Sequence, residues 1–148
     1  MDEKYKIFTV LMASINRSIR KIKTEEMAEF HLKSPHVSCL YYLYKKDTLT
    51  AKELCDICEE DKANVSRALD YLKTNGYLVR HTEDNKKYKI HLTLTEMGKA
   101  TACKIAEKID RILEEAGEGI SEEDREIMYR SLSLISTNLQ KRCNQYDK

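Results

Sequence analysis

The stretch on which the fold depends is residues 61–76, which read DKANVSRALDYLKTNG. Its apolar side chains fall at positions i, i+3, i+4 and i+7, the spacing that lines one side of an α-helix; they are Val65, Ala68, Leu69 and Leu72. Asp61 is a favourable N-cap, and Gly76 is a favourable stop after the last turn. The stretch therefore predicts a short helix with one buried side and one polar side.

The polar side of this helix carries side chains that suit DNA. Arg and Asn form paired hydrogen bonds with guanine and adenine edges in the major groove, whereas Ser and Lys suit phosphates. The candidate contacts are Lys62, Asn64, Ser66, Arg67 and Tyr71. For Arg67, the alternative is a solvated side chain that pairs with Asp70. Many surface helices look like this, so the flanking segments decide the interpretation.

The segment before this helix predicts a second, shorter helix. Leu49-Thr50 is expected to be extended, and Thr50-Ala-Lys-Glu53 has the pattern of a capping box that opens a helix to about Cys58. Only a few residues separate the two helices. Two short helices joined in this way, the second with a polar face, are typical of a helix-turn-helix.

The segment after Gly76 predicts a β-hairpin. Residues 77–80 read as a strand that ends at Arg80, residues 81–87 as a polar turn, and residues 88–94 alternate apolar and polar side chains. Such alternation indicates a half-buried strand. A hairpin directly after a helix-turn-helix is a wing, here with a basic tip.

Further helices are predicted on both sides of this unit. Residues 4–23 carry a long apolar stripe, and 24–33 form a less regular link. Ser34-Pro35 is expected to cap and start a helix that ends near residues 45–47. Two more helices are expected from Thr95 to about Ala116 and, after a second capping box at Ser121, to Cys143. The inner face of the helix after Pro35 is expected to contain Val37, Leu40, Tyr41 and Tyr44.

The predicted fold class is mainly α with a small β-hairpin: a winged helix-turn-helix flanked by N- and C-terminal helices. We assign residues 1–33 to an N-terminal helix of a dimerisation region, 34–99 to the winged unit and 100–148 to C-terminal dimerisation helices, within one structural domain. The long stripe of residues 4–23 needs a partner surface, either the C-terminus of the same chain or a second subunit.

Composition narrows the function classes. The chain has 148 residues and a formal net charge of +1, with eight Lys/Arg against five Asp/Glu in residues 61–99 and three against nine in residues 107–126. A basic segment followed by an acidic one suits a protein with one side toward nucleic acid. We find no run that could span a bilayer, no secretory signal and an odd number of cysteines, so we expect a cytoplasmic protein without disulfides or a membrane partner.

No catalytic pattern emerges from the sequence. It contains no glycine-rich phosphate loop and no Gly-x-Ser-x-Gly, so we expect neither an enzyme nor a cofactor. The four histidines lack the i, i+4 spacing of a helical metal site, and we predict no metal. Cys55-x-x-Cys58 lacks both a βαβ context and a second ligand pair, so structural packing is favoured over a redox or zinc site.

In this order and spacing the motifs resemble the MarR family of winged helix-turn-helix transcriptional regulators. The motifs that carry the resemblance are Leu49-Thr50-x-x-Glu53-Leu54, Asp61-Lys62-x-x-Val65-Ser66-Arg67-x-Leu69-x-x-Leu72, Gly76-Tyr77-Leu78-Val79-Arg80 and Leu94-Thr95-x-x-Gly98. They cover about residues 49–99, and the flanking helix order is also similar.

The resemblance implies a homodimer that binds a near-palindromic operator in double-stranded DNA. The helix of residues 61–75 would enter the major groove, and the wing would lie near the minor groove. By position, Asn64, Ser66 and Arg67 correspond to groove- and phosphate-facing residues, and Arg80, Lys86 and Lys87 join the candidate contacts. The wing departs from the family's Asp-x-Arg tip, because Asp84-Asn85-Lys86-Lys87 has no arginine. Lys favours phosphate attraction over sequence reading.

The resemblance also implies release from DNA by a small molecule or an oxidant. Tyr41 and Tyr44 are candidates for lining a ligand pocket, with core-edge packing as the alternative. Cys39, close to several tyrosines, is the candidate redox residue, although core filling is favoured because the family's sensing cysteine lies in the first helix.

Three functions remain open at this stage. The first is a sequence-specific DNA-binding regulator, and we expect it to be a repressor. The second is a winged-helix module that binds another protein without reading DNA. The third is a thiol redox protein acting through Cys55 and Cys58.

Overall fold

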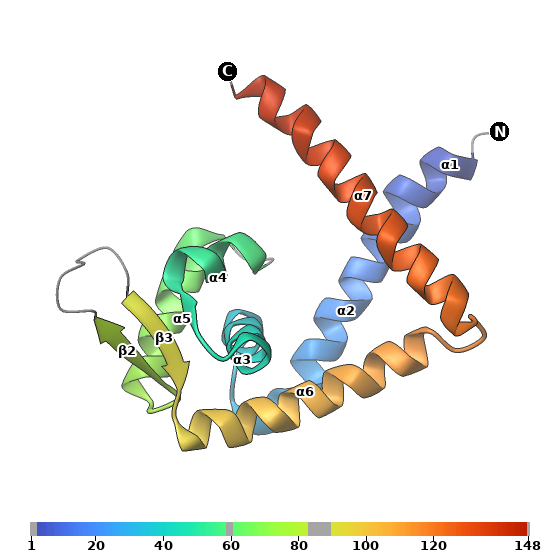
Figure 1. The fold of residues 1–148 in the computed structure, drawn as a ribbon. Helices are drawn as coiled ribbons and strands as arrows, with labels where there is room; N and C mark the ends of the chain where they lie inside the picture. The colour runs from blue at the N-terminus through green and yellow to red at the C-terminus, as the bar shows by residue number, and fades with distance from the viewer. Residues whose placement is uncertain (1–2, 59–60, 83–89, 148) are drawn as a thin grey trace. The chain divides into compact units, whose positions relative to one another are not determined.

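The computed structural model describes residues 3–58, 61–82 and 90–147. The chain forms two compact units, Met1–Ile109 and Asp110–Lys148. We describe each unit by itself (Figure 1).

The first unit begins with one long, continuous helix made of three consecutive segments. These are α1 (Glu3–Lys6), the π-helical segment η1 (Ile7–Leu11) and α2 (Met12–Glu26). The prediction of a helix over residues 4–23 is confirmed, although the π-helical turn was not anticipated. The apolar stripe of this helix is exposed, at Tyr5, Ile7, Phe8, Val10, Leu11, Ile15, Ile19 and Ile22.

A short 3-10 turn, η2 (Ala28–Phe30), leads to α3 (Ser34–Lys46). Met27 before this turn is fully buried. The expectation that Ser34 caps α3 was wrong, because Lys33 occupies the N-cap with extended backbone angles. The backbone N–H of Lys33 donates to Nδ1 of His36 at 3.0 Å, so the imidazole at the third helical position reaches back to the N-cap backbone, as the N3 side chain of a capping box does.

The inner face of α3 also differs from the prediction. Val37, Cys39, Leu40 and Leu43 are buried, whereas Tyr41 is half-buried and Tyr44 is 36% exposed. The two tyrosines therefore lie at the edge of the core and not within it. Cys39 fills the core in the manner of a small apolar side chain.

The helix-turn-helix is confirmed as α4 (Ala51–Ile57) and α5 (Lys62–Thr74). The hydroxyl of Thr50 accepts a hydrogen bond from the backbone N–H of Glu53 and donates one to its carboxylate. Asp61 caps α5 by accepting from the backbone N–H of Asn64 at 2.7 Å. At the other end, Gly76 adopts a positive φ of 81°, which glycine tolerates without strain.

The sheet has three strands in the order β1-β3-β2, all antiparallel. They are β1 (Leu49–Thr50), β2 (Leu78–Thr82) and β3 (Ile90–Leu94). The predicted two-strand hairpin therefore gains a third strand, because Leu49 pairs with Leu92. Residues 81 and 82, which we assigned to the turn, continue β2 opposite β3.

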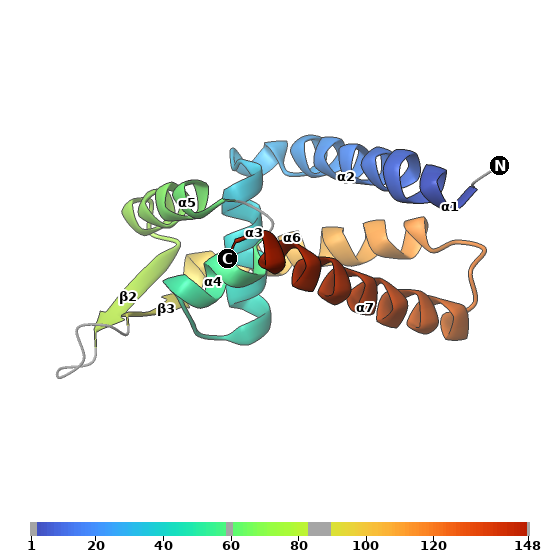
Figure 2. The same ribbon diagram turned by 90° about the horizontal axis from the view of Figure 1, so that it is seen from above.

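In Figures 1 and 2, β2 and β3 extend from the winged unit on the side of α5, away from α3. Leu78, Leu92 and Leu94 are buried on the face of the sheet that joins the core. Leu72 of α5 and Leu54 of α4 complete that core.

Helix α6 (Glu96–Ala116) starts directly after the sheet and continues into the second unit. Ala102 and Ile105 bury its apolar side in the first unit. Lys108 holds the end of the N-terminal helix region against α6, because its Nζ lies 2.7 Å from a carboxylate oxygen of Glu29 and 3.4 Å from one of Glu26. The hydrogen bond with Glu29 raises the pKa of Lys108.

The second unit contains the end of α6 and α7 (Glu122–Tyr146). Ser121 caps α7 by accepting from the backbone N–H of Asp124, as predicted. Arg125 fixes the turn before it by donating to the backbone oxygens of Ile120 and Gly117. Helix α7 continues three residues beyond the predicted end at Cys143, and many of its apolar side chains are exposed: Ile127, Tyr129, Leu132, Leu134, Leu139 and Tyr146. Over the described ranges, none of the helices combines the length and apolarity needed to cross a bilayer.

Gly98 offers a test of how tightly α6 joins the sheet. A Cβ at this buried position would lie 2.0 Å from the backbone oxygen of Tyr77. Replacing a helical Gly by Ala normally stabilises by about 1 kcal/mol. Here the clash is with backbone, so we expect Gly98→Ala to destabilise the fold by about 1–3 kcal/mol.

The measurement is the urea unfolding midpoint followed by far-UV circular dichroism, at one protein concentration. Lys99→Ala, at the exposed neighbouring position, should leave the free energy of unfolding within about 0.5 kcal/mol of wild type. A Gly98→Ala protein as stable as the Lys99→Ala control would contradict the close approach of α6 to Tyr77.

Candidate nucleic-acid interface

Helix α5 presents its polar side because its apolar side is fixed in the core. Val65, Ala68, Leu69 and Leu72 are all at most 3% exposed, and α5 packs on α3 and β2. The predicted stripe is thus confirmed. The candidate contacts Lys62, Ser66 and Arg67 are exposed, and Asn64 is half-buried.

Hydrogen bonds join Asn64 to Arg67 and to the capping residue Asp61. The Asn64 amide nitrogen donates to Oδ2 of Asp61 at 3.2 Å. The Asn64 amide oxygen accepts from Nη2 of Arg67. Arg67 therefore pairs with Asn64 in this structure, and not with Asp70 as in the alternative considered above.

Asp70 instead pairs with Arg80. The Nη2 atom of Arg80 on β2 lies 2.8 Å from Oδ1 of Asp70 on α5. This ion pair ties the root of the wing to the helix in front of it. Both side chains are partly exposed, so the pair contributes at most about 1 kcal/mol to stability.

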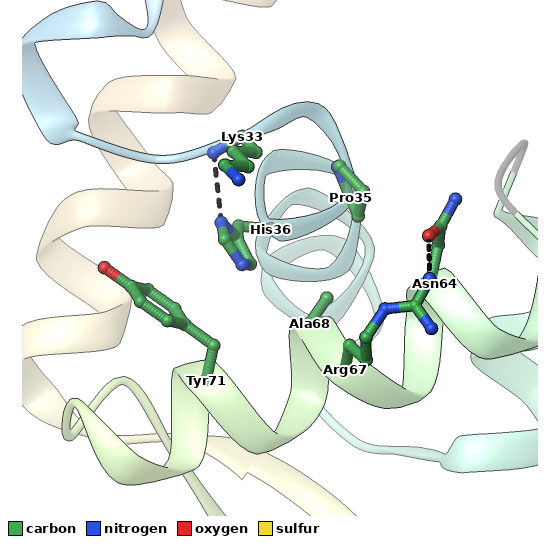
Figure 3. A pocket seen from close by; sticks show the side chains of 7 residues that line it. All are labelled: Lys33, Pro35, His36, Asn64, Arg67, Ala68 and Tyr71. Carbon is green, nitrogen blue, oxygen red and sulfur yellow. Dashed lines mark hydrogen bonds between the residues drawn. The ribbon is translucent and has the colours of Figure 1, made fainter.

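A cavity of about 350 Å³ lies between the start of α3 and the outward side of α5 (Figure 3). Its lining combines cationic, aromatic and amide groups: Lys33, Pro35, His36, Asn64, Arg67, Ala68 and Tyr71. Three of the predicted DNA contacts thus share one hollow with residues of α3. Neither Lys33 nor His36 was predictable as a site residue from the sequence, because only the packing of α3 on α5 brings them to this surface.

The His36 ring couples α3 to α5. It stacks on Tyr71 with 4.3 Å between ring centroids and 22° between planes. Its Nδ1 accepts the Lys33 backbone hydrogen bond, so the neutral ring with Nε2 protonated fits the site. Burial, and then the charge of Lys33, lower the pKa of His36.

The other sequence candidates lie apart from this hollow. Tyr41 contacts Tyr42 edge to face, and Lys45 lies over its ring. A hydrogen bond with Cys103 raises the pKa of Tyr44. Cys39 is fully buried in the core. The cavity of Figure 3 contains none of these three residues in its lining, and their predicted roles stay predictions.

Two predicted contacts cannot be placed, because Lys86 and Lys87 lie outside the described residues. All five cysteines are described, and none of them forms a disulfide; Cys55 is half-buried and Cys58 buried. In the described parts of the chain, no three His, Cys, Asp or Glu side chains gather as a metal site would require.

Comparison with known proteins identifies the central segment. Residues 32–87 match the model of the MarR family. This segment contains α3, β1, α4, α5 and β2. Residues 32–87 are therefore similar to proteins of the MarR family.

The resemblance to MarR proteins predicted from the sequence is therefore confirmed, and solved structures extend the likeness to most of the chain. A MarR family regulator from Listeria monocytogenes, complexed with a 26mer DNA, is 22% identical with a TM-score of 0.83, over 94% of this chain and 90% of that one. A MarR family regulator from Silicibacter pomeroyi is 23% identical with a TM-score of 0.78, over 86% of each chain.

A third similar structure is Staphylococcus aureus MepR in its DNA-binding conformation. It is 19% identical with a TM-score of 0.82, over 89% of this chain and 98% of that one. At these identities the likeness shows that the chain has a MarR fold, with its winged unit and flanking helices. The search of curated proteins found no match.

The His36 site predicts a pH dependence of stability. The folded state favours the neutral ring, whereas the unfolded chain binds the proton at the ordinary pKa of about 6.5. Stability should therefore fall as the pH drops below about 6.5, because the unfolded state then binds more protons. The His36→Gln protein should lose less stability over the same pH range, because glutamine can accept the hydrogen bond from the Lys33 backbone and does not titrate.

The measurement compares urea midpoints at pH 7.5 and pH 5.5 for wild type and His36→Gln. The two proteins are otherwise identical, so every other contribution to the pH dependence cancels in the comparison. Equal losses of stability in the two proteins would show that His36 does not carry the effect.

Proposed function

We propose that this protein is a transcriptional repressor that binds near-palindromic double-stranded DNA as a homodimer. The observation that carries the proposal is the outward side of α5, where Asn64, Ser66 and Arg67 lie on a helix whose opposite side is buried. The second helix of a helix-turn-helix enters the major groove with residues of its N-terminal half at base edges. The DNA-bound structures among similar proteins support the same assignment.

The surface around α5 suits a polyanion. Lys33 and Lys62 flank the reading residues, and Arg67 and the His36–Tyr71 stack line the adjoining hollow. Lysine and arginine supply most of the phosphate contacts in such interfaces. The lysines of the wing, Lys86 and Lys87, would add phosphate attraction.

The exposed apolar stripes support a homodimer. Val10 and Ile15 in the N-terminal helix are 53% and 58% exposed, and Leu134 and Leu139 in α7 are 61% and 58% exposed. An exposed apolar surface of this length usually marks a site where another protein surface binds. A second copy of the chain is the partner that also fits a near-palindromic operator, because a two-fold protein matches a two-fold site.

The proposal includes an effector and no catalytic step. A small molecule or an oxidant would release the repressor from DNA, with Tyr41, Tyr44 and Cys39 as the candidates for sensing it. No cofactor is assigned. Such a regulator would act in the cytoplasm, where the bacterial or archaeal chromosome lies.

The proposal predicts salt-dependent binding to duplex DNA. Affinity should fall about a hundredfold or more between 50 and 200 mM salt, because bound counterions are released. Arg67→Ala should weaken binding to the selected operator by about 1–3 kcal/mol. Fluorescence anisotropy with a duplex selected by the wild-type protein measures both effects.

Arg111→Ala is the matched control, since it removes the same charge at an exposed position of α6. It should bind as wild type does. DNA affinity that does not change with salt concentration, or a selection that enriches no duplex, would contradict sequence-specific DNA binding. Either result would favour the alternative of a module that binds another protein through α4 and α5.

The dimer has its own test. Ile15→Glu places a charge in the middle of the exposed stripe, so it should shift the protein toward monomers and weaken operator binding at least tenfold. Light scattering coupled to size-exclusion chromatography gives the mass. Arg17→Glu, off the stripe but on the same helix, should remain dimeric, and a monomeric wild-type protein would contradict the proposal.

A further inference from the structure

The hydrogen bonds of Asp61, Asn64 and Arg67 form a chain along the outward side of α5. The residues are spaced by three, so their side chains lie one above the other on the helix. Asp61 first caps the helix through its Oδ1 atom, at 2.7 Å from the Asn64 backbone nitrogen. Its second oxygen, Oδ2, accepts from the Asn64 amide at 3.2 Å.

Only one orientation of the Asn64 amide satisfies this chain. An ionised carboxylate can only accept a hydrogen bond, and a guanidinium can only donate one. The Asn64 nitrogen must therefore point to Asp61 and its oxygen to Arg67, which is how they lie. Figure 3 shows the Arg67 guanidinium turned along α5 toward Asn64.

This arrangement already engages both atoms through which Asn64 would read DNA. Recognition of adenine by asparagine uses both the amide oxygen and the amide nitrogen. Each of these two atoms makes one hydrogen bond within the protein, which leaves the amide one N–H and one lone pair in a fixed orientation, whereas Arg67 uses one of its five N–H groups on Asn64. Arg67 therefore keeps donors for a guanine edge, while Asn64 holds the Arg67 guanidinium.

The neighbouring arginine shows the contrast. Arg80 is held by a carboxylate, Asp70, in a charge-assisted bond. Arg67 is held by a neutral amide, which fixes the side chain without neutralising it. A guanidinium that stays charged and is already ordered loses less side-chain entropy when it binds a base.

We propose that Asn64 is a positioning residue that sets the Arg67 guanidinium for a guanine edge, and that Asp61 orients Asn64. The inference rests on the proposed function and refines it, because it assigns base reading to Arg67 and removes it from Asn64. The specificity of α5 would then centre on one guanine in each half-site.

The test is selection from a random double-stranded DNA library, followed by sequencing, for wild type, Arg67→Ala, Asn64→Ala and the double variant. Wild type should enrich a guanine that Arg67→Ala no longer prefers. Asn64→Ala should reduce the preference for that same guanine about fivefold and leave the other positions unchanged. In the Arg67→Ala background, Asn64→Ala should change affinity less than about twofold, because the two residues act as one unit.

Asp61→Ser separates positioning from folding. Serine is also a strong N-cap, so α5 keeps its start, but the second carboxylate oxygen that orients Asn64 is gone. The guanine preference should fall about twofold at the same base pair. Thermal unfolding of each variant checks that the fold is intact, and Asn64→Ala should not lower the melting temperature, because alanine favours a helix more than asparagine does.

The outcomes separate the two proposals. A change at a different base pair on Asn64→Ala, additive with Arg67→Ala, would show that Asn64 reads DNA directly and would overturn the inference alone. An unchanged guanine preference in Asn64→Ala would also overturn it. A wild-type protein that enriches no sequence would overturn the proposed function and the inference with it.

Discussion

The structure depends on the burial of one side of α5 against α3 and the sheet. Val65, Leu69 and Leu72 leave water almost completely, and each such side chain stabilises the fold by about 1.5–3 kcal/mol. Because a helix rotates by a fixed angle per residue, fixing this side also fixes the opposite one. The direction in which Arg67 and Asn64 point is thus a consequence of core packing.

The same constraint explains how the rest of the winged unit is built around α5. Asp61 and Gly76 set its two ends, so the polar side has a defined length. The His36–Tyr71 stack and the Arg80–Asp70 ion pair then attach α3 and β2 to its flanks. Each attachment is modest in energy, but together they leave α5 little freedom to turn. A rigid helix suits a reader of DNA, because recognition requires side chains at set positions.

Most of the fold could be predicted from the sequence because its signals are local. The caps at Thr50, Asp61 and Ser121 involve residues three apart, and the stripe of α5 repeats within two turns. What was missed depends on residues far apart in the chain. The pairing of Leu49 with Leu92, the capping of α3 by His36 and the exposure of Tyr44 all follow from tertiary packing, for which a single sequence offers no spacing rule. For the site, the positions on α5 were predictable, but the bonds among them and the contribution of Lys33 and His36 were not.

In the proposed complex the outward side of α5 lies in the major groove of the operator. Protection of guanine N7 from dimethyl sulfate tests it most directly, because N7 faces that groove. We expect protected guanines in two patches about one helical turn apart, with the protection lost at one guanine per patch in Arg67→Ala. Full binding with every guanine N7 still reactive would contradict it.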